Sequence, residues 1–338
     1  LDLTIIENSG PHFQAAAVFT SNQVVAAPVI WSREVMKGQQ VRAVVLNSGG
    51  ANACTGPQGF ADTHHTAEKV AQLLEVSASE IVVCSTGLIG ELLPMPKIVA
   101  GLEEISKKMS QESLLDAAAA IMTTDSVSKI SVAQMKGAHC AGIAKGAGML
   151  APALATMLSV VMTDAILPVH VQEIFTRVTD RTFNRIDSDG CTSTNDTVLL
   201  MASGASGVIL SDAECESMLT EVCTSLARQL IDDAEGSTKT VEIQVKGART
   251  ESDAVEVARA CARNNLLKCA IFGEDPNWGR VLAAVGTAKS EIDQNLIDVT
   301  INQQMVCRMG TNLEVEPKID LSNKHVDIMI NLNLGKYS

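Results

Sequence analysis

Aromatic residues are scarce in this chain: tryptophan, tyrosine and phenylalanine together make up 3% of its 338 residues. Hydrophobic residues still make up 46%, and there are 23 glycines, so the core must be built mainly from aliphatic side chains in close contact. Such a composition favours an α/β fold over an all-β sandwich. The length suits one large domain or two closely packed domains.

Basic residues are also too few to form a nucleic-acid-binding surface. The formal net charge is −13, and no basic stripe with interleaved aromatic residues occurs, so we expect no nucleic-acid partner. The sequence lacks an apolar run long enough to cross a bilayer, and it lacks a signal-peptide pattern. We therefore expect no membrane association and a cytoplasmic location.

Paired cysteines are missing as well. The nine cysteines are scattered from Cys54 to Cys307 without a CxxC pair, which predicts buried thiols in a reducing compartment. The six histidines show no metal-ligand spacing, and the calcium-loop pattern that begins at Asp187 lacks the required glycine and the terminal glutamate. We expect neither a metal site nor a bound cofactor.

Strands and helices alternate in the predicted secondary structure. Short β-branched runs at 41–46 and 81–84 predict buried strands, with a helical pattern over 57–75 between them. Ser211 and Glu214 form a capping-box pattern at the start of the clearest helix, which ends before Gly236. We also expect helices over 114–121, 168–184 and 251–263, and strands over 240–245, 299–301 and 326–331.

Thr156 lies in a small-residue segment, directly before an apolar run that predicts a strand. Most threonines in such a place simply begin a strand. A cut between Ala155 and Thr156 would instead free an α-amine to act as general base for the threonine hydroxyl, a recognised way to activate this weak nucleophile. The glycine-rich approach and the upstream Lys145 favour this second interpretation. It is also the only division of the chain that the sequence indicates.

Other candidate residues follow predicted strands or end predicted helices. Thr86 and Gly87 come after the strand at 81–84, where a hydroxyl and a backbone N–H can stabilise an oxyanion, although an ordinary turn has the same composition. The run from Met122 to Asp125 offers hydroxyls to a ligand or a helix cap. Glu235 ends the capping-box helix in an acidic cluster, which a helix dipole disfavours.

Taken together, these motifs resemble the ornithine acetyltransferase family, the glutamate N-acetyltransferases of arginine biosynthesis. The resemblance runs in order over most of the chain. The matching stretches are Asn47–Gly56, Cys84–Gly87, Ile121–Asp125, Lys145–Leu158, Ser193–Thr197, Asp233–Lys239 and Asp275–Arg280.

The resemblance implies an α/β fold of stacked β-sheets flanked by helices, the fold of self-processed acyltransferases with an N-terminal threonine. The precursor would cut itself between Ala155 and Thr156 into an α chain (1–155) and a β chain (156–338), which assemble as α₂β₂. Thr156 would take the acetyl group from N-acetylornithine and pass it to glutamate, while Thr86 and Gly87 stabilise the oxyanion.

By the same resemblance, Thr124, Lys145, Thr156 and Glu235 would bind substrate, with Lys145 suited to the α-carboxylate. Thr123 remains an alternative to Thr124. Some family members also use acetyl-CoA as an acetyl donor, and the residues leave that question open.

The sequence departs from the family at Gly50, where asparagine is usual, and near Ser338, where the family's Asn-containing tail is not evident. We therefore predict no C-terminal site residue. Two other functions stay open at this stage. One is a self-processing amidohydrolase or aminopeptidase that passes the acyl group to water, and the other is a catalytically inactive binding protein.

Overall fold

The computed structural model describes residues 2–148, 157–314 and 317–338. The chain forms two compact units, one ending at Glu235 and the other running from Gly236 to Ser338. Within the described ranges, none of the helices combines the length and the apolar character needed to cross a membrane.

The first unit contains a five-stranded sheet in the order β2-β8-β7-β6-β5. The pair β7 and β8 is parallel, and the other neighbouring pairs are antiparallel. The predicted strand after Thr156 is β7, whereas β5 and β6 were not predicted. The strands are β2 (Gln14–Phe19), β5 (Lys129–Met135), β6 (Ala138–Lys145), β7 (Leu158–Thr163) and β8 (Thr197–Ala202).

A three-stranded sheet in the order β1-β3-β4 lies in the same unit. Its parallel pair, β3 and β4, corresponds to the strands predicted at 41–46 and 81–84, and the predicted helix between them is α2. The strands are β1 (Leu3–Glu7), β3 (Ala43–Asn47) and β4 (Ile81–Ser85).

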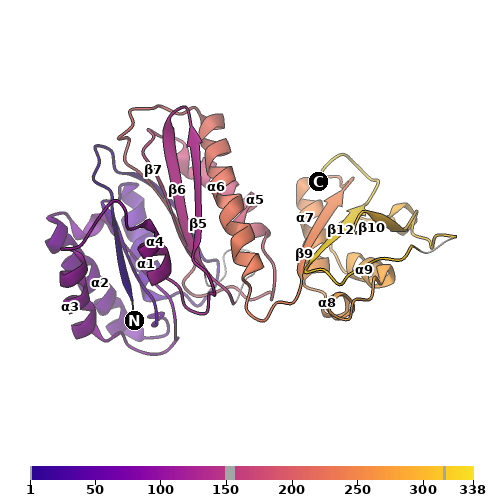
Figure 1. Ribbon diagram of the computed structural model, residues 1–338, viewed down its shortest axis with the longest axis horizontal. Coiled ribbons are helices and arrows are strands. Elements are labelled where there is room, and N and C mark those ends of the chain that lie inside the picture. The colour runs from indigo at the N-terminus through magenta and orange to yellow at the C-terminus, as the bar shows by residue number, and fades with distance from the viewer. Residues whose placement is uncertain (1, 149–156, 315–316) are drawn as a thin grey trace. The chain divides into compact units, whose positions relative to one another are not determined.

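The two sheets are stacked face to face through a shared aliphatic core. Side chains from both sheets form one buried cluster, which includes Leu46 of β3, Val82 of β4, Val160 of β7 and Leu199 of β8. Helices α2 (Gly56–Leu74) and α3 (Met95–Ile105) cover the outer face of the three-stranded sheet. Helices α5 (Val171–Arg181) and α6 (Asp212–Asp232) cover the outer face of the five-stranded sheet (Figure 1). The predicted fold class of stacked sheets flanked by helices is confirmed.

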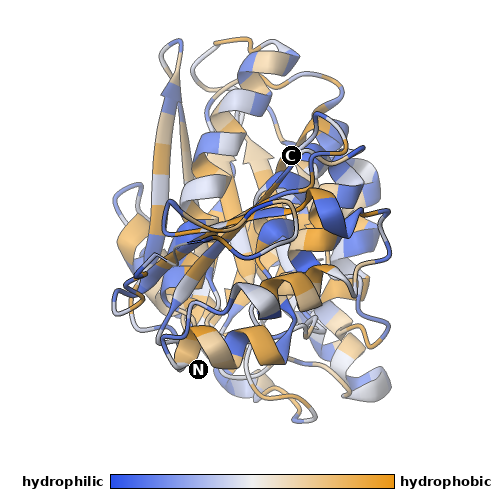
Figure 2. Ribbon diagram, turned by 90° about the vertical axis from the view of Figure 1, so that its right-hand side faces the viewer, coloured by the Kyte–Doolittle hydropathy of each residue, from blue (hydrophilic) through white to orange (hydrophobic). Residues whose placement is uncertain are grey.

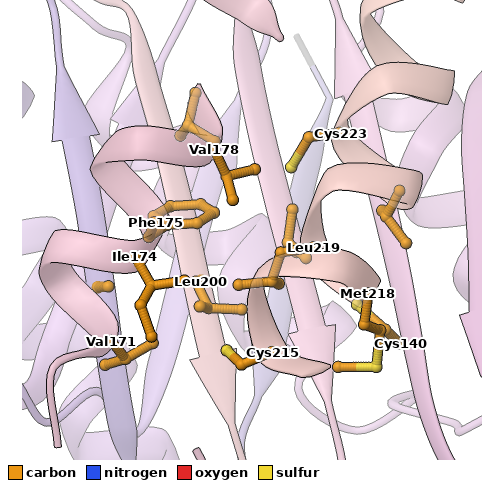
Figure 3. Close-up of a cluster of buried hydrophobic side chains, with 14 of the residues drawn as sticks. Cys140, Val171, Ile174, Phe175, Val178, Leu200, Cys215, Met218, Leu219 and Cys223 are labelled. Carbon is orange, nitrogen blue, oxygen red and sulfur yellow. The ribbon is translucent and has the colours of Figure 1, made fainter. Parts of the chain in front are cut away.

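The outer helix pair packs closely on the five-stranded sheet. In Figure 3, Phe175 and Val178 of α5 (Val171–Arg181) point toward Leu219 of α6 (Asp212–Asp232) above Leu200 of β8. Residues three and four positions apart share a helix face, so each helix buries one apolar stripe. The predicted capping box at the start of α6 is present, and α5 is shorter than the predicted helix at 168–184.

The first unit contains further short helices. The helix predicted at 114–121 is α4, which packs beside β1 and β6. The elements are α1 (Ala27–Val35), η1 (Met36–Gly38), η2 (Ala78–Glu80), α4 (Leu114–Ala120) and η3 (Phe183–Arg185).

The second unit has its own sheet and its own core. The strand order is β11-β10-β12-β9, and β9 and β12 are parallel. Segments of both hydropathy classes alternate along the helices in Figure 2, as expected for elements with one buried face. The elements are β9 (Thr240–Lys246), α7 (Glu251–Ala262), α8 (Asn265–Phe272), α9 (Trp278–Val285), η4 (Gln294–Leu296), β10 (Asp298–Ile301), β11 (Gln304–Cys307) and β12 (His325–Asn331).

The cysteine prediction is partly wrong. All nine thiols are free, but Cys54, Cys191 and Cys269 are exposed rather than buried. Burial does raise the pKa of other thiols, to about 12 for Cys84 and further above the ordinary value for Cys223, so those side chains behave as small hydrophobic groups.

Candidate active site

Lys145 is the centre of the polar groups buried in the first unit. It is the last residue of β6 and is 0% exposed. Its Nζ donates hydrogen bonds to Oγ1 of Thr86 at 3.0 Å and to Oγ1 of Thr123 at 2.8 Å. Two predicted site residues, Lys145 and Thr86, are therefore in direct contact although 59 positions separate them.

The environment of Lys145 lowers the pKa of its ammonium group to about 8. Burial is the main cause, because it disfavours the charged form, and the negative charges of Asp125 and Asp196 act in the opposite direction. Lys145 is consequently mostly a cation at neutral pH and becomes neutral as the pH rises through about 8. A buried cation with hydroxyl neighbours can bind a carboxylate.

The hydroxyl of Thr86 is oriented for hydrogen-bond donation. Its backbone N–H already donates to the Asn47 carbonyl at 3.0 Å. A charged Lys145 can only donate, so at their contact the Thr86 oxygen is the acceptor. The hydroxyl hydrogen can then point to another acceptor, such as a developing oxyanion.

Gly87 has a backbone conformation that favours glycine. Its φ is +131°, and a Cβ atom there would lie 2.3 Å from the carbonyl carbon of Gly49. The turn after β4 therefore packs directly against the loop after β3, and any side chain at position 87 would separate them.

Two asparagines hold these loops together. The Asn47 side chain donates to the Gly50 carbonyl and accepts a hydrogen bond from Ser85. Asn195, also buried, donates to the carbonyls of Ala51 and Ser85. Gly50, the departure from the family pattern, is closely packed: a Cβ there would lie 2.7 Å from Cδ2 of Leu93.

A buried ion cluster lies beside Lys145. Nζ of Lys129, which is 0% exposed, is 2.6 Å from carboxylate oxygens of both Asp125 and Asp233. Asp125 also accepts hydrogen bonds from the N–H groups of Gly146 and Thr123. Burial raises the pKa of both carboxyls. Hydrogen bonds from Gly146 and Lys129 to Asp125, and from Lys129 and Ser126 to Asp233, outweigh it, so each pKa lies below its ordinary value. The cluster joins β5, β6 and the end of α6.

Glu235 lies next to the residues that follow Lys145. Its backbone N–H donates to the Ala147 carbonyl at 2.8 Å, and its carboxylate is so close to Gly148 that a Cβ there would be 3.2 Å from Oε2. The Glu235 side chain is exposed. These contacts explain why acidic residues are tolerated at the C-terminal end of α6: Asp233 pairs with Lys129, and Glu235 lies beside Ala147 and Gly148.

The predicted cleavage point, Ala155 and Thr156, lies outside the described residues. The residue that follows it is described: the Met157 N–H donates to Oδ1 of Asp196 at 2.9 Å. Leu158, the first residue of β7, pairs with Lys145 across the antiparallel ladder. The chain therefore enters β7 directly beside Lys145.

Thr123, and not Thr124, touches Lys145. Both threonines are exposed, but within the described ranges the Thr124 side chain makes no hydrogen bond to that lysine. The sequence left this choice open. It also gave no role to Asp196, Lys129 and Asn195, although Asp196 and Asn195 lie in a stretch that matches the family.

The run from Asp275 to Arg280 belongs to the second unit. Asn277 caps α9 by accepting the N–H of Arg280, and Trp278 packs against the core of that unit. These contacts favour a structural role for this run, as a turn that caps α9 and packs on the core, over a role in binding substrate. In the described part of the chain, no three His, Cys, Asp or Glu side chains are grouped to hold a metal ion.

Comparison with known proteins identifies the family. The ArgJ family profile matches residues 1–338. The chain belongs to the ArgJ family. It is 55% identical to the arginine biosynthesis bifunctional protein ArgJ of Thermobifida fusca over 100% of this chain and 88% of that protein. It is 54% identical to the ArgJ protein of Streptomyces avermitilis over 99% of this chain and 88% of that protein. The family prediction made from the sequence is confirmed.

Solved structures of the family are also similar in sequence. An ornithine acetyltransferase from Mycobacterium tuberculosis, complexed with ornithine, is 53% identical with a TM-score of 0.44. That match covers 45% of this chain and 83% of the solved chain. The bifunctional ArgJ protein of Bacillus halodurans is 33% identical over 52% of this chain and 87% of the solved chain, with a TM-score of 0.48.

Proposed function

We propose that this protein transfers an acetyl group from N-acetylornithine to glutamate in arginine biosynthesis, with Thr156 as the nucleophile. Membership of the ArgJ family over the full length of the chain supports the activity. One structural observation supports the location: the buried Lys145 joins the buried Thr86 and the exposed Thr123 where β6 ends, next to the residue from which β7 starts.

The nucleophile forms by self-cleavage in this proposal. The Thr156 hydroxyl attacks the Ala155 carbonyl, an N→O acyl shift gives an ester, and water hydrolyses that ester. The products are the Ala155 carboxylate and the free α-amine of Thr156. Such an amine has a pKa of about 7.7–8.0, so an appreciable fraction is neutral and able to accept a proton near pH 7.

Acetyl transfer then proceeds in two halves. The Thr156 oxygen attacks the acetyl carbonyl of N-acetylornithine while its amine takes the hydroxyl proton, and the Thr86 hydroxyl and the Gly87 backbone stabilise the oxyanion. The proton passes to the departing nitrogen, and ornithine leaves. The glutamate amine attacks the acetyl-threonine ester, and the Thr156 oxygen recovers a proton as acetylglutamate forms.

Lys145 and its neighbours bind the substrate in this scheme. The buried ammonium pairs with the substrate α-carboxylate, and Glu235 attracts the cationic side chain of ornithine. Thr123 joins Thr124 as a proposed substrate contact, because the Thr123 hydroxyl accepts a hydrogen bond from the Lys145 ammonium. The cycle needs no cofactor, and acetyl-CoA enters it only as an alternative acetyl donor to Thr156.

The assembly and the location belong to the same proposal. The α chain (1–155) and the β chain (156–338) remain together and associate as α₂β₂ in the cytoplasm. The pairing of β6 with β7 supports the association of the α and β chains. The nine free thiols support a reducing compartment such as the cytoplasm.

An assay with N-acetylornithine tests the proposal. Acetylglutamate should appear only when glutamate is added, and Thr156→Ala should give none. Release of ornithine at an unchanged rate without glutamate would indicate the hydrolase alternative. Absence of both products from cleaved, folded protein would indicate a binding protein.

A further inference from the structure

Asp196 is a buried carboxylate that the proposed reaction does not use. It directly precedes β8, is 0% exposed, and accepts the Met157 N–H on Oδ1 at 2.9 Å and the Ser193 N–H on Oδ2 at 3.3 Å. Its own carbonyl accepts the N–H of Thr20 at 2.9 Å. Both the backbone and the side chain of Asp196 are therefore fixed.

Met157 is held on both of its backbone polar groups by consecutive residues. Its N–H donates to the Asp196 carboxylate, and its carbonyl accepts the N–H of Thr197 at 3.2 Å. Regular pairing of β7 with β8 begins one residue later, at Leu158 and Thr197. The Asp196 side chain thus acts as a strand partner just where the ladder ends.

A carboxylate is a costly group for this task. Burial raises the pKa of Asp196 well above its ordinary value, and the N–H groups of Met157 and Ser193 offset this only in part. A neutral side chain could accept one N–H at lower cost. The second carboxylate oxygen, Oδ2, accepts the Ser193 N–H, and this bond fixes the orientation of the carboxylate plane. The hydrogen bond from the Met157 N–H to Oδ1 is therefore fixed in direction as well as in distance.

We propose that Asp196 is a positioning residue that orients the nucleophile through Met157. The proposal rests on the proposed function, in which Thr156 attacks. The peptide unit that contains the Met157 N–H is planar and also contains the Cα of the preceding residue. Holding that N–H therefore constrains the atom from which the nucleophile's side chain departs, and small errors in nucleophile placement reduce rates steeply.

The first test is Asp196→Asn. This change keeps the volume of the side chain but replaces one of the two accepting carboxylate oxygens with an amide NH₂ group, which can only donate. Self-cleavage, followed by intact mass, should slow at least ~10-fold, and kcat of the cleaved fraction should fall at least ~10-fold. The KM for N-acetylornithine should stay within about twofold, because no substrate contact is removed. Ser159→Ala is the matched control: Ser159 is also buried on β7, and its hydroxyl donates to the Ile143 carbonyl.

Wild-type behaviour of Asp196→Asn in both cleavage and kcat would overturn the proposal. So would an equal loss in Ser159→Ala, since the effect would then be a general loss of packing. Wild-type protein that neither cleaves nor transfers acetyl would instead overturn the proposed function itself.

Hydrogen exchange on the cleaved wild-type protein covers the case in which Asp196→Asn does not fold. The Met157 amide should exchange at least ~100-fold more slowly than an unprotected amide, because its hydrogen bond must open first. Rapid exchange of this amide in folded protein would contradict the proposal without any variant.

Discussion

At the scale of single residues, Lys145 gives the activity a dependence on pH. Its pKa of about 8 means that the ammonium is present below pH 8 and lost above it. Binding of the substrate carboxylate needs the cation, so kcat/KM for N-acetylornithine should fall about tenfold per pH unit above pH 8. The Thr156 amine must be neutral to act as a base, so its deprotonation produces only the rise of kcat/KM at lower pH and not the fall above pH 8.

A pH profile of kcat/KM from pH 6 to 10 checks this assignment. Lys145→Arg serves as the matched variant because its side chain keeps its charge over the whole range. A falling limb centred on pH 8 that persists in Lys145→Arg would show that another group causes it.

Thr86 is the second residue whose contacts give a prediction. Thr86→Val keeps the shape but removes the hydroxyl that Lys145 orients, and kcat should fall by ~10²-fold or more, as for other oxyanion donors. Steady-state kinetics measure the change. Thr66→Val is the control, since the buried Thr66 hydroxyl donates to the Asp62 carbonyl within α2. An unchanged kcat in Thr86→Val removes the proposed role.

At the scale of elements, the sequence identified those with a strong local pattern. The capping box of Ser211 and Glu214 and the β-branched runs of β3 and β4 are local signals, and the structure has those elements. Strands β5 and β6 were not predicted because alternating small and polar residues from Lys129 to Lys145 give a weak pattern. Their strand conformation depends on the pairing of β5 with β6 and of β6 with β7, which is a tertiary effect.

The contacts of the site were harder to predict than its residues. Thr86, Lys145 and Glu235 were singled out in the sequence and given roles by the family resemblance, but no local pattern links Lys129 to Asp233. The ion pair of Lys129 with Asp233, about 100 positions away, depends on how the elements pack, so only the structure reveals it.

The Lys129 cluster should stabilise the junction of β5, β6 and α6. Lys129→Met removes the cation between the buried Asp125 and the partly buried Asp233, and we expect the free energy of unfolding to fall by about 3–5 kcal/mol. Denaturant unfolding measures this change. Lys108→Met is the control, because Lys108 pairs with Glu104 on the surface, and it should have no measurable effect. Equal stability of the two variants would show that the cluster contributes nothing.

At the scale of the whole molecule, two different boundaries divide the chain. The sequence indicated a covalent division at Thr156, and the structure divides into compact units after Glu235. The proposed cleavage point lies within the first unit, between two neighbouring strands of one sheet. The unit boundary has no linker composition, so the sequence gave no signal for it.

Intact mass tests the covalent division. Cleavage of the 35.7 kDa chain should give fragments of about 16 and 19 kDa, in proportion to their lengths of 155 and 183 residues. Both should elute together in native gel filtration, because β6 and β7 pair over six positions. A single uncut species after long incubation of purified wild-type protein counts against the threonine mechanism.

The pairing of β6 with β7 also decides how the mature protein responds to dilution. Once the connection between these strands is cut, unfolding turns one folded particle into two chains, and refolding requires them to find each other. By mass action, the melting temperature of the cleaved protein should rise with its concentration. That of uncleaved Thr156→Ala at equal oligomeric state should rise less steeply, because each particle separates into half as many chains, so self-cleavage makes the folded protein more sensitive to dilution.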